Sequence, residues 1–313
     1  MFRSGFVSLI GRPNVGKSTL LNALLGEKLA ITSPKPQTTR RRIQGILTLP
    51  EEAQIVFIDT PGIHRPKHKL GEKMVKAAEE ALEGIDAIIL VIDAVDGFIA
   101  WDREIAELVA KADQPVLAVW NKVDAVGSME GEGSAPAEGQ VPVGCRTQLD
   151  QAMEAFRQQY PEWPTFAISA LNGQGTGQLI AAVIKLLPEN PPYFPDDILT
   201  DDPERVVVAE LIREQALALL NQEVPHAVAV EVTDMKDRGG DAREYVAATI
   251  YVERESQKGI IIGNGGSMLK EIGRRARVEI EALLGRPVYL DLWVKVKKDW
   301  RDSDSKLREL GFQ

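Results

Sequence analysis

The segment Gly11-Arg-Pro-Asn-Val-Gly16-Lys-Ser18 constrains the fold of this chain more than any other feature. It follows the apolar run Phe6–Ile10 and opens the helix-forming run Ser18–Leu25, so the motif Gly-x-x-x-x-Gly-Lys-Ser stands between a strand and a helix. Its glycines let successive N–H groups curve around an anion, and the helix adds the positive end of its dipole. We expect phosphate contacts from Asn14, Val15, Gly16, Lys17, Ser18 and Thr19.

Short apolar, β-branched segments alternate with amphipathic segments as far as Leu187. Alternation of this kind predicts an α/β domain over residues 1–187, with a doubly wound, mostly parallel sheet that binds ligands at the carboxyl ends of its strands. The further strands are expected at Ala53–Asp59, Ala87–Asp93, Val116–Asn121 and Thr165–Ser169, and the further helices at Lys69–Leu82, Arg103–Ala112, Leu149–Tyr160 and Gly177–Leu187.

A linker is expected at residues 188–202, because four prolines between Pro188 and Pro195 precede an acidic run. A second, α+β domain then occupies residues 203–313. Its helices are predicted at Pro203–Leu220, Ser267–Leu284 and Ser303–Leu310, the last being C-terminal, and its strands at Ala227–Thr233, Tyr245–Val252 and Val288–Val296. Within the first domain, Gly127–Gly144 carries no period and is interpreted as a flexible surface insertion.

The segment Asn121-Lys-Val-Asp124 directly follows a predicted strand and indicates guanine. The Asp124 carboxylate can accept hydrogen bonds from N1–H and the 2-amino group of guanine, whereas adenine would leave it unpaired. Asn121 can hold the loop, and the stem of Lys122 can lie against the base. The segment Ser169-Ala170-Leu171 follows the last strand, where a backbone N–H can meet the guanine O6.

The segment Asp59-Thr-Pro-Gly62 follows another strand and suits a metal ion and a γ-phosphate. Asp59 can hold Mg²⁺ through a water molecule, Ser18 can ligate it directly, and the Gly62 N–H can touch the γ-phosphate. The loop Ile31–Gly45 lies between these motifs and contains two adjacent threonines. We favour Thr39 over Thr38 as the second Mg²⁺ ligand.

Four motifs in this order, each at a strand end, resemble the G-protein superfamily over about Gly5–Leu187. The resemblance implies a GTPase that converts GTP to GDP and phosphate with Mg²⁺, with catalytic roles for Lys17, Thr39 and Gly62. Ile63 stands where many G proteins carry a water-orienting glutamine, so hydrolysis must use another element. In related bacterial G proteins an asparagine at the position of Asn14 helps to hold K⁺. Asn14 as a simple turn residue is the alternative.

The second domain contains Gly263-Asn264-Gly265-Gly266 after an apolar, strand-like run and before a long predicted helix. This resembles a KH domain of type II, whose Gly-x-x-Gly loop clamps a single-stranded nucleic-acid backbone. Ten basic and five acidic residues between Arg254 and Lys298 make this segment net +5 in a chain of net charge −9. RNA contacts are expected from Lys258, Gly263, Asn264, Gly265, Gly266, Lys270 and Arg274.

A G domain followed by a KH-like domain resembles the Era family of bacterial ribosome-assembly GTPases over nearly the whole chain. The resemblance implies binding to small-subunit ribosomal RNA near its 3′ end during maturation of that subunit, a cytoplasmic location, and peripheral membrane association without a transmembrane segment. The single cysteine, Cys145, fits a reducing compartment. The alternatives are a switch acting on protein partners through a KH-like docking surface, and a tRNA-modification or large-subunit GTPase.

Overall fold

The computed structural model describes residues 1–35, 37–63, 68–126, 143–236 and 243–312. The chain divides into two compact units. The first comprises residues 1–29, 39–64 and 75–201, and the second comprises residues 30–38, 65–74 and 202–313. The predicted insertion Gly127–Gly144 lies, except for its last two residues, outside the described part of the chain.

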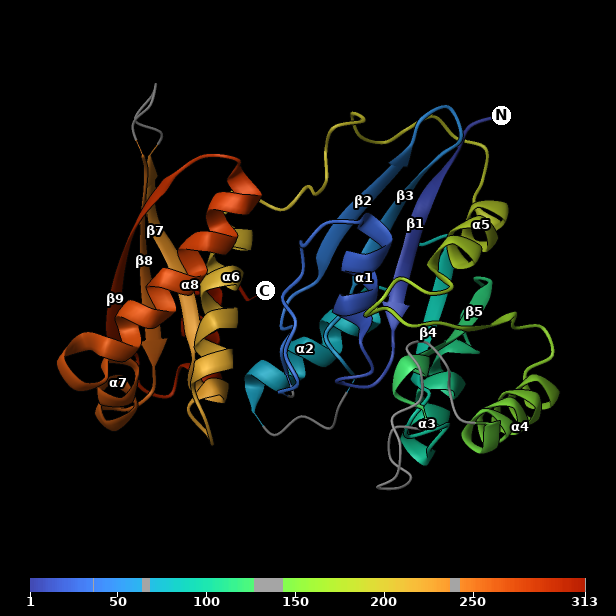
Figure 1. Cartoon of the computed structure of the whole chain (residues 1–313), viewed down its shortest axis with the longest axis horizontal. Helices are drawn as coiled ribbons and strands as arrows, with labels where there is room; N and C mark the ends of the chain where they lie inside the picture. The colour runs from blue at the N-terminus through green and yellow to red at the C-terminus, as the bar shows by residue number, and fades with distance from the viewer. Residues whose placement is uncertain (36, 64–67, 127–142, 237–242, 313) are drawn as a thin grey trace. The chain divides into compact units, whose positions relative to one another are not determined.

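The first unit is built on a six-stranded sheet (Figure 1). Its order is β2-β3-β1-β4-β5-β6, and every pairing is parallel except β2 with β3. The predicted doubly wound, mostly parallel sheet is therefore confirmed. The strands are β1 Arg3–Ile10, β2 Ile43–Leu49, β3 Ala53–Asp59, β4 Ala87–Asp93, β5 Val116–Asn121 and β6 Thr165–Ala167.

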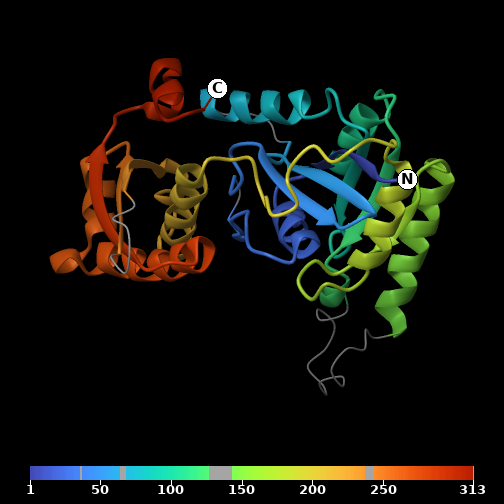
Figure 2. The ribbon, with the colours of Figure 1, turned by 90° about the horizontal axis from the view of Figure 1, so that it is seen from above.

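Helices cover both faces of this sheet, which is why β3, β4 and β5 are buried along their whole length. Figure 2 shows α1 on one side of the strands and α3 on the other. The apolar residues of α3 and α4 pack with Ile88, Leu90 and Ile92 of β4 in one core. The helices are α1 Lys17–Leu25, α3 Ala100–Val109, α4 Val143–Gln159 and α5 Thr176–Leu186. The helix α2 Lys69–Glu80 belongs to this unit from residue 75 onward and to the second unit up to residue 74.

The strand β2 was not predicted from the sequence, where Ile31–Gly45 was interpreted as one loop. In the structure the chain enters β2 at Ile43 and pairs antiparallel with β3 from Ile43↔Asp59 to Leu49↔Ala53. The strand is at the edge of the sheet and only partly buried, so it lacks the continuous apolar run of the central strands. Hydrogen bonds to β3, rather than apolar content, decide its conformation.

Residues 188–201 pack on the first unit rather than leaving its surface. The fully buried Gln54 side chain of β3 holds them. Its Oε1 accepts the N–H groups of Tyr193 at 2.8 Å and Phe194 at 2.9 Å, and its Nε2 donates to the Phe194 carbonyl at 2.9 Å and to the Thr48 hydroxyl at 3.0 Å. All four hydrogen-bonding positions of one amide are used, so this part of the proline-rich segment has a defined path.

The edge strand β2 receives the end of the same segment. The Ile46 N–H donates to the Leu199 carbonyl at 2.8 Å, and the Thr200 hydroxyl donates to the Gln44 carbonyl at 2.6 Å. An edge strand exposes unpaired backbone groups, and these two bonds satisfy part of that edge.

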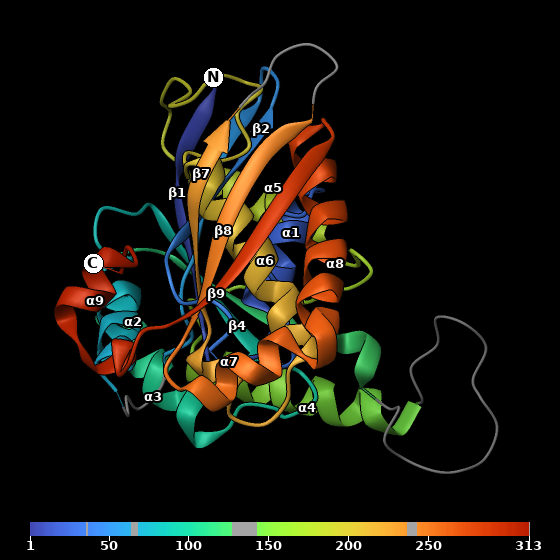
Figure 3. The ribbon, with the colours of Figure 1, turned by 90° about the vertical axis from the view of Figure 1, so that its left-hand side faces the viewer.

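The second unit contains a three-stranded sheet of order β7-β8-β9, with β7 antiparallel and β9 parallel to β8 (Figure 3). The helices α6 and α8 pack on one face of the sheet and share its core. This α+β arrangement is a KH fold, as predicted. The elements are α6 Glu204–Leu219, β7 Ala229–Lys236, β8 Glu244–Val252, α7 Glu255–Ile262, α8 Ser267–Leu284, β9 Val288–Val296 and α9 Asp304–Glu309.

The apolar run before the Gly-x-x-Gly loop is helical, and its interpretation as strand-like was wrong. It belongs to α7, where Ile261 is buried while Ile260 is 49% exposed. The Gln257 side chain begins this helix by accepting the N–H groups of Glu253 and Arg254, both at 3.0 Å. A run of three isoleucines is too short to separate helix from strand by periodicity.

No described helix is both long enough and apolar enough to cross a membrane.

Replacing Gln54 with leucine should lower the free energy of unfolding by about 2 kcal/mol, because two partly buried N–H groups and a carbonyl lose their partner. Urea titration of the purified chain measures this. The matched control is Gln178→Leu on α5, at an exposed position, which should change the value by no more than about 0.5 kcal/mol. Equal losses in the two variants would contradict a role for Gln54 in holding the segment.

Candidate functional site

The phosphate-binding loop connects β1 to α1 at the carboxyl end of the sheet, as the motif predicts. Its backbone turns sharply at Gly16, which has φ 94° and directly precedes α1. A Cβ at this position would lie 2.3 Å from Nδ2 of Asn121, so both the dihedral angle and the close neighbour require glycine. The loop therefore presents the first N–H groups of α1 to a ligand.

Lys17 begins α1 and turns back across the loop. Its Nζ donates to the carbonyl of Arg12 at 2.8 Å and to that of Gly11 at 3.1 Å. Burial lowers the pKa of Lys17 to about 8, against the opposing attraction of Asp59. Burial likewise raises the pKa of Asp59. The charged amine of Lys17 is buried within a loop of N–H groups. An anion bound in this loop would offset the free-energy cost of burying that charge.

Three oxygen-bearing side chains converge beside Lys17 in a way that fits a magnesium ion. The Ser18 hydroxyl donates to Oδ2 of Asp59 at 2.5 Å, and Oγ1 of Thr39 lies 2.8 Å from Oγ of Ser18 and 3.4 Å from the same Oδ2. Oδ1 of Asp59 is buried without a hydrogen-bond partner in the described residues. An orphaned carboxylate oxygen beside two hydroxyls is a donor set of the type that Mg²⁺ prefers.

The neighbouring Thr38 points elsewhere, with its hydroxyl donating to the Lys35 carbonyl at 2.6 Å. This geometry supports the choice of Thr39 over Thr38. Gly62 lies against the phosphate-binding loop, because a Cβ there would be 2.5 Å from the backbone nitrogen of Pro13. The segment after Asp59 thus approaches the loop as closely as a backbone can.

The proposed guanine side of the site is organised by Asn121, which is 2% exposed at the end of β5. Its Nδ2 donates to the Val15 carbonyl at 2.9 Å, and its Oδ1 accepts the Ala170 N–H at 2.9 Å. One amide therefore joins the phosphate-binding loop to the segment after β6. Ser169 is fully buried in that segment, whereas Leu171 is 79% exposed.

Asp124 and Lys122 flank this amide. The Asp124 side chain is exposed and accessible to a base. Nζ of Lys122 donates to the Asn14 carbonyl at 2.7 Å and to Oδ2 of Asp93 at 2.5 Å. The stem of Lys122 thus crosses from the base-recognition loop to the phosphate-binding loop.

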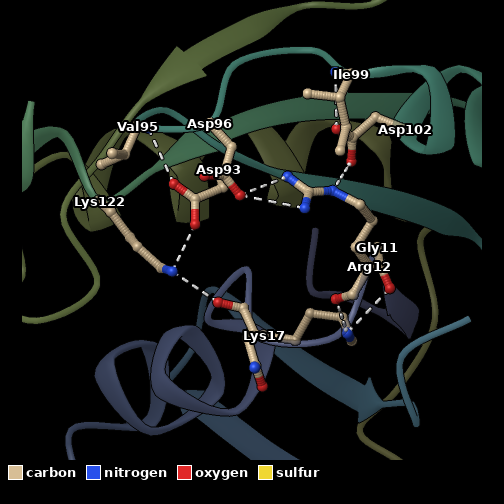
Figure 4. A network of polar contacts seen from close by, with 10 residues as sticks. Gly11, Arg12, Lys17, Asp93, Val95, Asp96, Ile99, Asp102 and Lys122 are labelled. Carbon is tan, nitrogen blue, oxygen red and sulfur yellow. Dashed lines mark hydrogen bonds and ion pairs between the residues drawn. The ribbon is translucent and has the colours of Figure 1, made fainter. Parts of the chain in front are cut away.

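A polar network beside the loop was not predicted from the sequence (Figure 4). Arg12 donates through Nε to Oδ1 of Asp102 at 2.8 Å, and through its two terminal nitrogens to Oδ2 of Asp96 at 3.2 and 3.3 Å. Asp93 belongs to the same acidic stretch. The available signal was Asp93 at the end of a predicted strand, and an aspartate three residues after the N-cap of a helix.

In the second unit the Gly-x-x-Gly loop connects α7 to α8. Gly263, Gly265 and Gly266 all have positive φ, at 70°, 58° and 82°. A Cβ at Gly263 would lie 2.8 Å from the Met268 nitrogen, whereas Gly266 has no atom within 4 Å of the same point. Asn264 and Gly265 are exposed at the tip. The loop ends at the N-terminus of α8, where N–H groups face outward.

An open groove of about 480 Å³ begins at this loop and runs along α8. Its polar lining is basic, and its apolar lining comes from α8 and β9. The lining includes Gly266, Leu269, Lys270, Gly273, Arg274, Arg277, Tyr289, Leu290 and Leu292. The predicted contacts Lys270 and Arg274 therefore share one groove with Gly266.

Arg274 is not free for a ligand without a rearrangement. Its Nε and one terminal nitrogen each donate to Glu271 at 2.8 Å, and Arg275 donates to the same carboxylate at 2.7 Å. These hydrogen bonds lower the pKa of Glu271 to about 2. The two arginines are exposed, so such pairs exchange readily with phosphate. Lys258, on α7, is partly exposed.

Two protein-family models match separate parts of the chain. A model described as 50S ribosome-binding GTPase matches residues 6–122, and a model described as KH domain matches residues 223–301.

Full-length relatives match the whole chain. GTPase Era of Carboxydothermus hydrogenoformans is 48% identical over 99% of this chain and 98% of its own length. GTPase Era of Geobacter metallireducens is 50% identical over the same shares.

Two solved structures match over both units. One is Era with MgGDPNP and nucleotides 1506–1542 of 16S ribosomal RNA, which is 42% identical with a TM-score of 0.90 and covers 100% of this chain and 99% of its own. The other is a variant of Aquifex aeolicus Era bound to GDP·AlF₄⁻, also 42% identical with a TM-score of 0.90, covering 99% of each chain.

The affinity for GDP should fall about fourfold between pH 7 and pH 8.5, because Lys17 with a pKa of about 8 loses its proton in this range in the unbound protein. Bound phosphate stabilises the charged amine, so binding must take up the proton. Calorimetric titration at several pH values measures the affinity. The variant Lys17→Met should bind more weakly at every pH and show no such slope. A pH-independent affinity in the original protein would refute the lowered pKa.

Proposed function

The chain belongs to the Era family of GTPases, and we propose that it uses GTP binding and hydrolysis to control its attachment to small-subunit ribosomal RNA near the 3′ end. In this role it acts in maturation of the small ribosomal subunit. The observation that carries the proposal is the similarity, across both units, to an Era structure that holds a GTP analogue and a 16S ribosomal RNA segment.

The nucleotide is held by the loop and by the two base-recognition segments. Lys17 and the N–H groups from Asn14 to Thr19 receive the phosphates. Asp124 and the Ser169–Leu171 segment receive guanine. The tie from Asn121 to both Val15 and Ala170 supports this assignment, because it fixes the spacing between the phosphate side and the base side.

Hydrolysis uses Ser18, Thr39 and Asp59 to hold Mg²⁺, which when bound neutralises charge on the phosphate oxygens. Lys17 adds charge on the leaving side, and the Gly62 N–H orients the γ-phosphate. Ile63 packs against the apolar core of β4, α3 and α4, so its side chain supplies no proton chemistry. An element other than the Ile63 side chain must therefore orient the attacking water. K⁺ held at Asn14 stays a prediction.

The RNA is held by the Gly-x-x-Gly loop and the basic groove along α8. Lys258, Lys270 and Arg274 contact the phosphates, while Gly263, Asn264, Gly265 and Gly266 admit the backbone. The loop geometry and the groove support this role. Exposed cations beside apolar side chains suit single-stranded nucleic acid, whose charge and bases are both accessible.

We assign the G domain to residues 1–187, the linker to 188–202 and the KH-like domain to 203–313. A cytoplasmic location follows from a ribosomal partner. Peripheral membrane association remains a prediction from the family resemblance.

The alternative of a switch that acts only on protein partners is not favoured, since the solved relative holds RNA. The name of the N-terminal family model mentions the 50S subunit, but that model covers residues 6–122 alone. The full-length relatives argue for Era rather than for a large-subunit GTPase.

Asp124→Asn should weaken GTP binding at least 10²-fold and shift preference toward xanthosine triphosphate, whose 2-oxo group accepts a hydrogen bond that the new amide donates. Competition between fluorescent GTP and unlabelled XTP, ITP and ATP measures the order. The exposed Asp113→Asn is a control with the same charge change away from the site. Equal binding of ATP and GTP by the original protein would show that the guanine assignment is mistaken.

RNA affinity should differ between the GTP-like and GDP states by roughly 5–150-fold, and by linkage RNA should change the affinity for the GTP analogue relative to GDP by the same factor. Titration of an RNA that spans the small-subunit 3′ end, in GDPNP and in GDP, measures the ratio. Equal affinities would leave the two activities uncoupled.

Gly266→Asp should abolish RNA binding by like-charge repulsion while leaving basal hydrolysis intact. Gly285→Asp, at the other end of α8, is the matched control, because both glycines have positive φ and no atom within 4 Å of an added Cβ. Loss of RNA binding in both variants would point to a damaged fold rather than to the loop.

A further inference from the structure

Arg12 is the second residue of the phosphate-binding loop, and its side chain points away from the loop toward Asp102 of α3 (Figure 4). Arg12 is 7% exposed and its main partner, Asp102, is 1% exposed. The Nε–Oδ1 distance between them is 2.8 Å. Asp96, the other partner, is much more exposed, with 54% of its side chain accessible. The strong contact is therefore the buried one.

Asp102 has a second task at the start of α3. Its Oδ2 accepts the Ile99 N–H at 3.1 Å, so the carboxylate both caps the helix and receives the guanidinium. Because both of its oxygens are engaged, the position of Arg12 is fixed relative to the first turn of α3. Burial raises the pKa of Asp102, and the bond from Arg12 counteracts this.

The backbone of Arg12, whose position is fixed in this way, contacts the side-chain amine of Lys17. The Arg12 carbonyl accepts Nζ of Lys17 at 2.8 Å. A chain of contacts thus runs from the N-terminus of α3 through Asp102 and Arg12 to the residue that receives the phosphates. A second set of contacts holds the loop two residues further on. There Nζ of Lys122 donates both to Asp93 and to the Asn14 carbonyl.

Folding stability does not explain why this chain has a buried ion pair between Arg12 and Asp102. Taking two charges out of water costs several kcal/mol per ion, and apolar residues of similar volume are often equally good or better for folding. A buried pair is better suited to defining one geometry. In enzyme active sites generally, displacement of a reacting group by about 1 Å can cost about 10²-fold in rate.

We propose that Arg12 and Asp102 are positioning residues for the phosphate-binding loop, which hold the backbone that places Lys17 without touching the nucleotide themselves. The proposal rests on the proposed function of Lys17 in GTP binding and hydrolysis. The placement of Lys17 would then require Asp102, a residue outside the loop motif in the first turn of α3.

The test compares Asp102→Asn, Arg12→Met and the double variant Arg12→Met/Asp102→Leu in the full-length protein. Steady-state GTP hydrolysis gives kcat/KM, and thermal melting reports the fold. Each single variant should lose about 10- to 100-fold in kcat/KM. The double variant removes both buried charges, so it should melt close to the original protein, yet keep the loss in kcat/KM.

Nucleotide affinities separate a displaced loop from a loosened fold. The loop receives the β-phosphate, so the three variants should lose about tenfold more affinity for GDP than for GMP. Arg12→Lys keeps the charge but not the fork of donors, and it should recover part of the loss. Asp96→Asn, which changes the exposed partner of the same guanidinium, should stay within about twofold of the original kcat/KM.

Two results would overturn the proposal. One is a folded Asp102→Asn or Arg12→Met variant with undiminished kcat/KM. The other is a double variant that recovers both melting temperature and kcat/KM, since this would make the pair merely structural. If the double variant does not fold, the second result is replaced by equal losses of GMP and GDP affinity in the Arg12→Lys variant, which would equally overturn the proposal. Lys17→Ala is run alongside, and its undiminished turnover would instead refute the proposed function.

Discussion

The site depends on the side chain of Asn121, whose single buried amide joins three separate segments of the first unit. It donates to the phosphate-binding loop at Val15 and accepts from Ala170 after β6, while its own backbone ends β5. Its nitrogen also occupies the space that a side chain at Gly16 would need. A rigid parallel sheet brings the three segments to one edge, and this amide sets the distance between the phosphate side and the base side.

Charge compensation is the second organising constraint. Lys17 and Asp59 are both buried, and burial opposes the charged form of each, so this part of the site is costly until a polyphosphate and a metal ion share its charges. Next to it, the carboxylates of Asp102 in α3 and of Asp93 at the end of β4 engage Arg12 and Lys122, respectively. These cations hold the loop in place, whereas Lys17 remains for the ligand. The position of each cation, rather than its residue type, decides whether it holds the loop or binds the ligand.

The second unit uses the same principle of a helix N-terminus beside glycines, but in an open form. The loop at Gly263–Gly266 leads into α8, and the groove along that helix is lined by basic and apolar side chains. The charge of Arg274, an exposed arginine of this groove, is shared with Glu271 until a stronger anion replaces that carboxylate. A net negative chain thus carries a local basic face, which the overall charge of −9 conceals.

Motif order and hydrophobic pattern were enough to predict both fold classes, most helices and strands, and the family, because glycine spacing and strand–helix alternation are local properties. They were not enough for β2, α7 or the Arg12 network. An edge strand and a three-isoleucine run have no distinctive period. Pairing with β3 decides the form of the strand. The three isoleucines are helical because they continue α7, which the Gln257 side chain begins. Arg12 and Asp102 are 90 residues apart, so nothing in the sequence relates them. Only the sheet, by placing the ends of β1 and β4 side by side, brings that charge pair together.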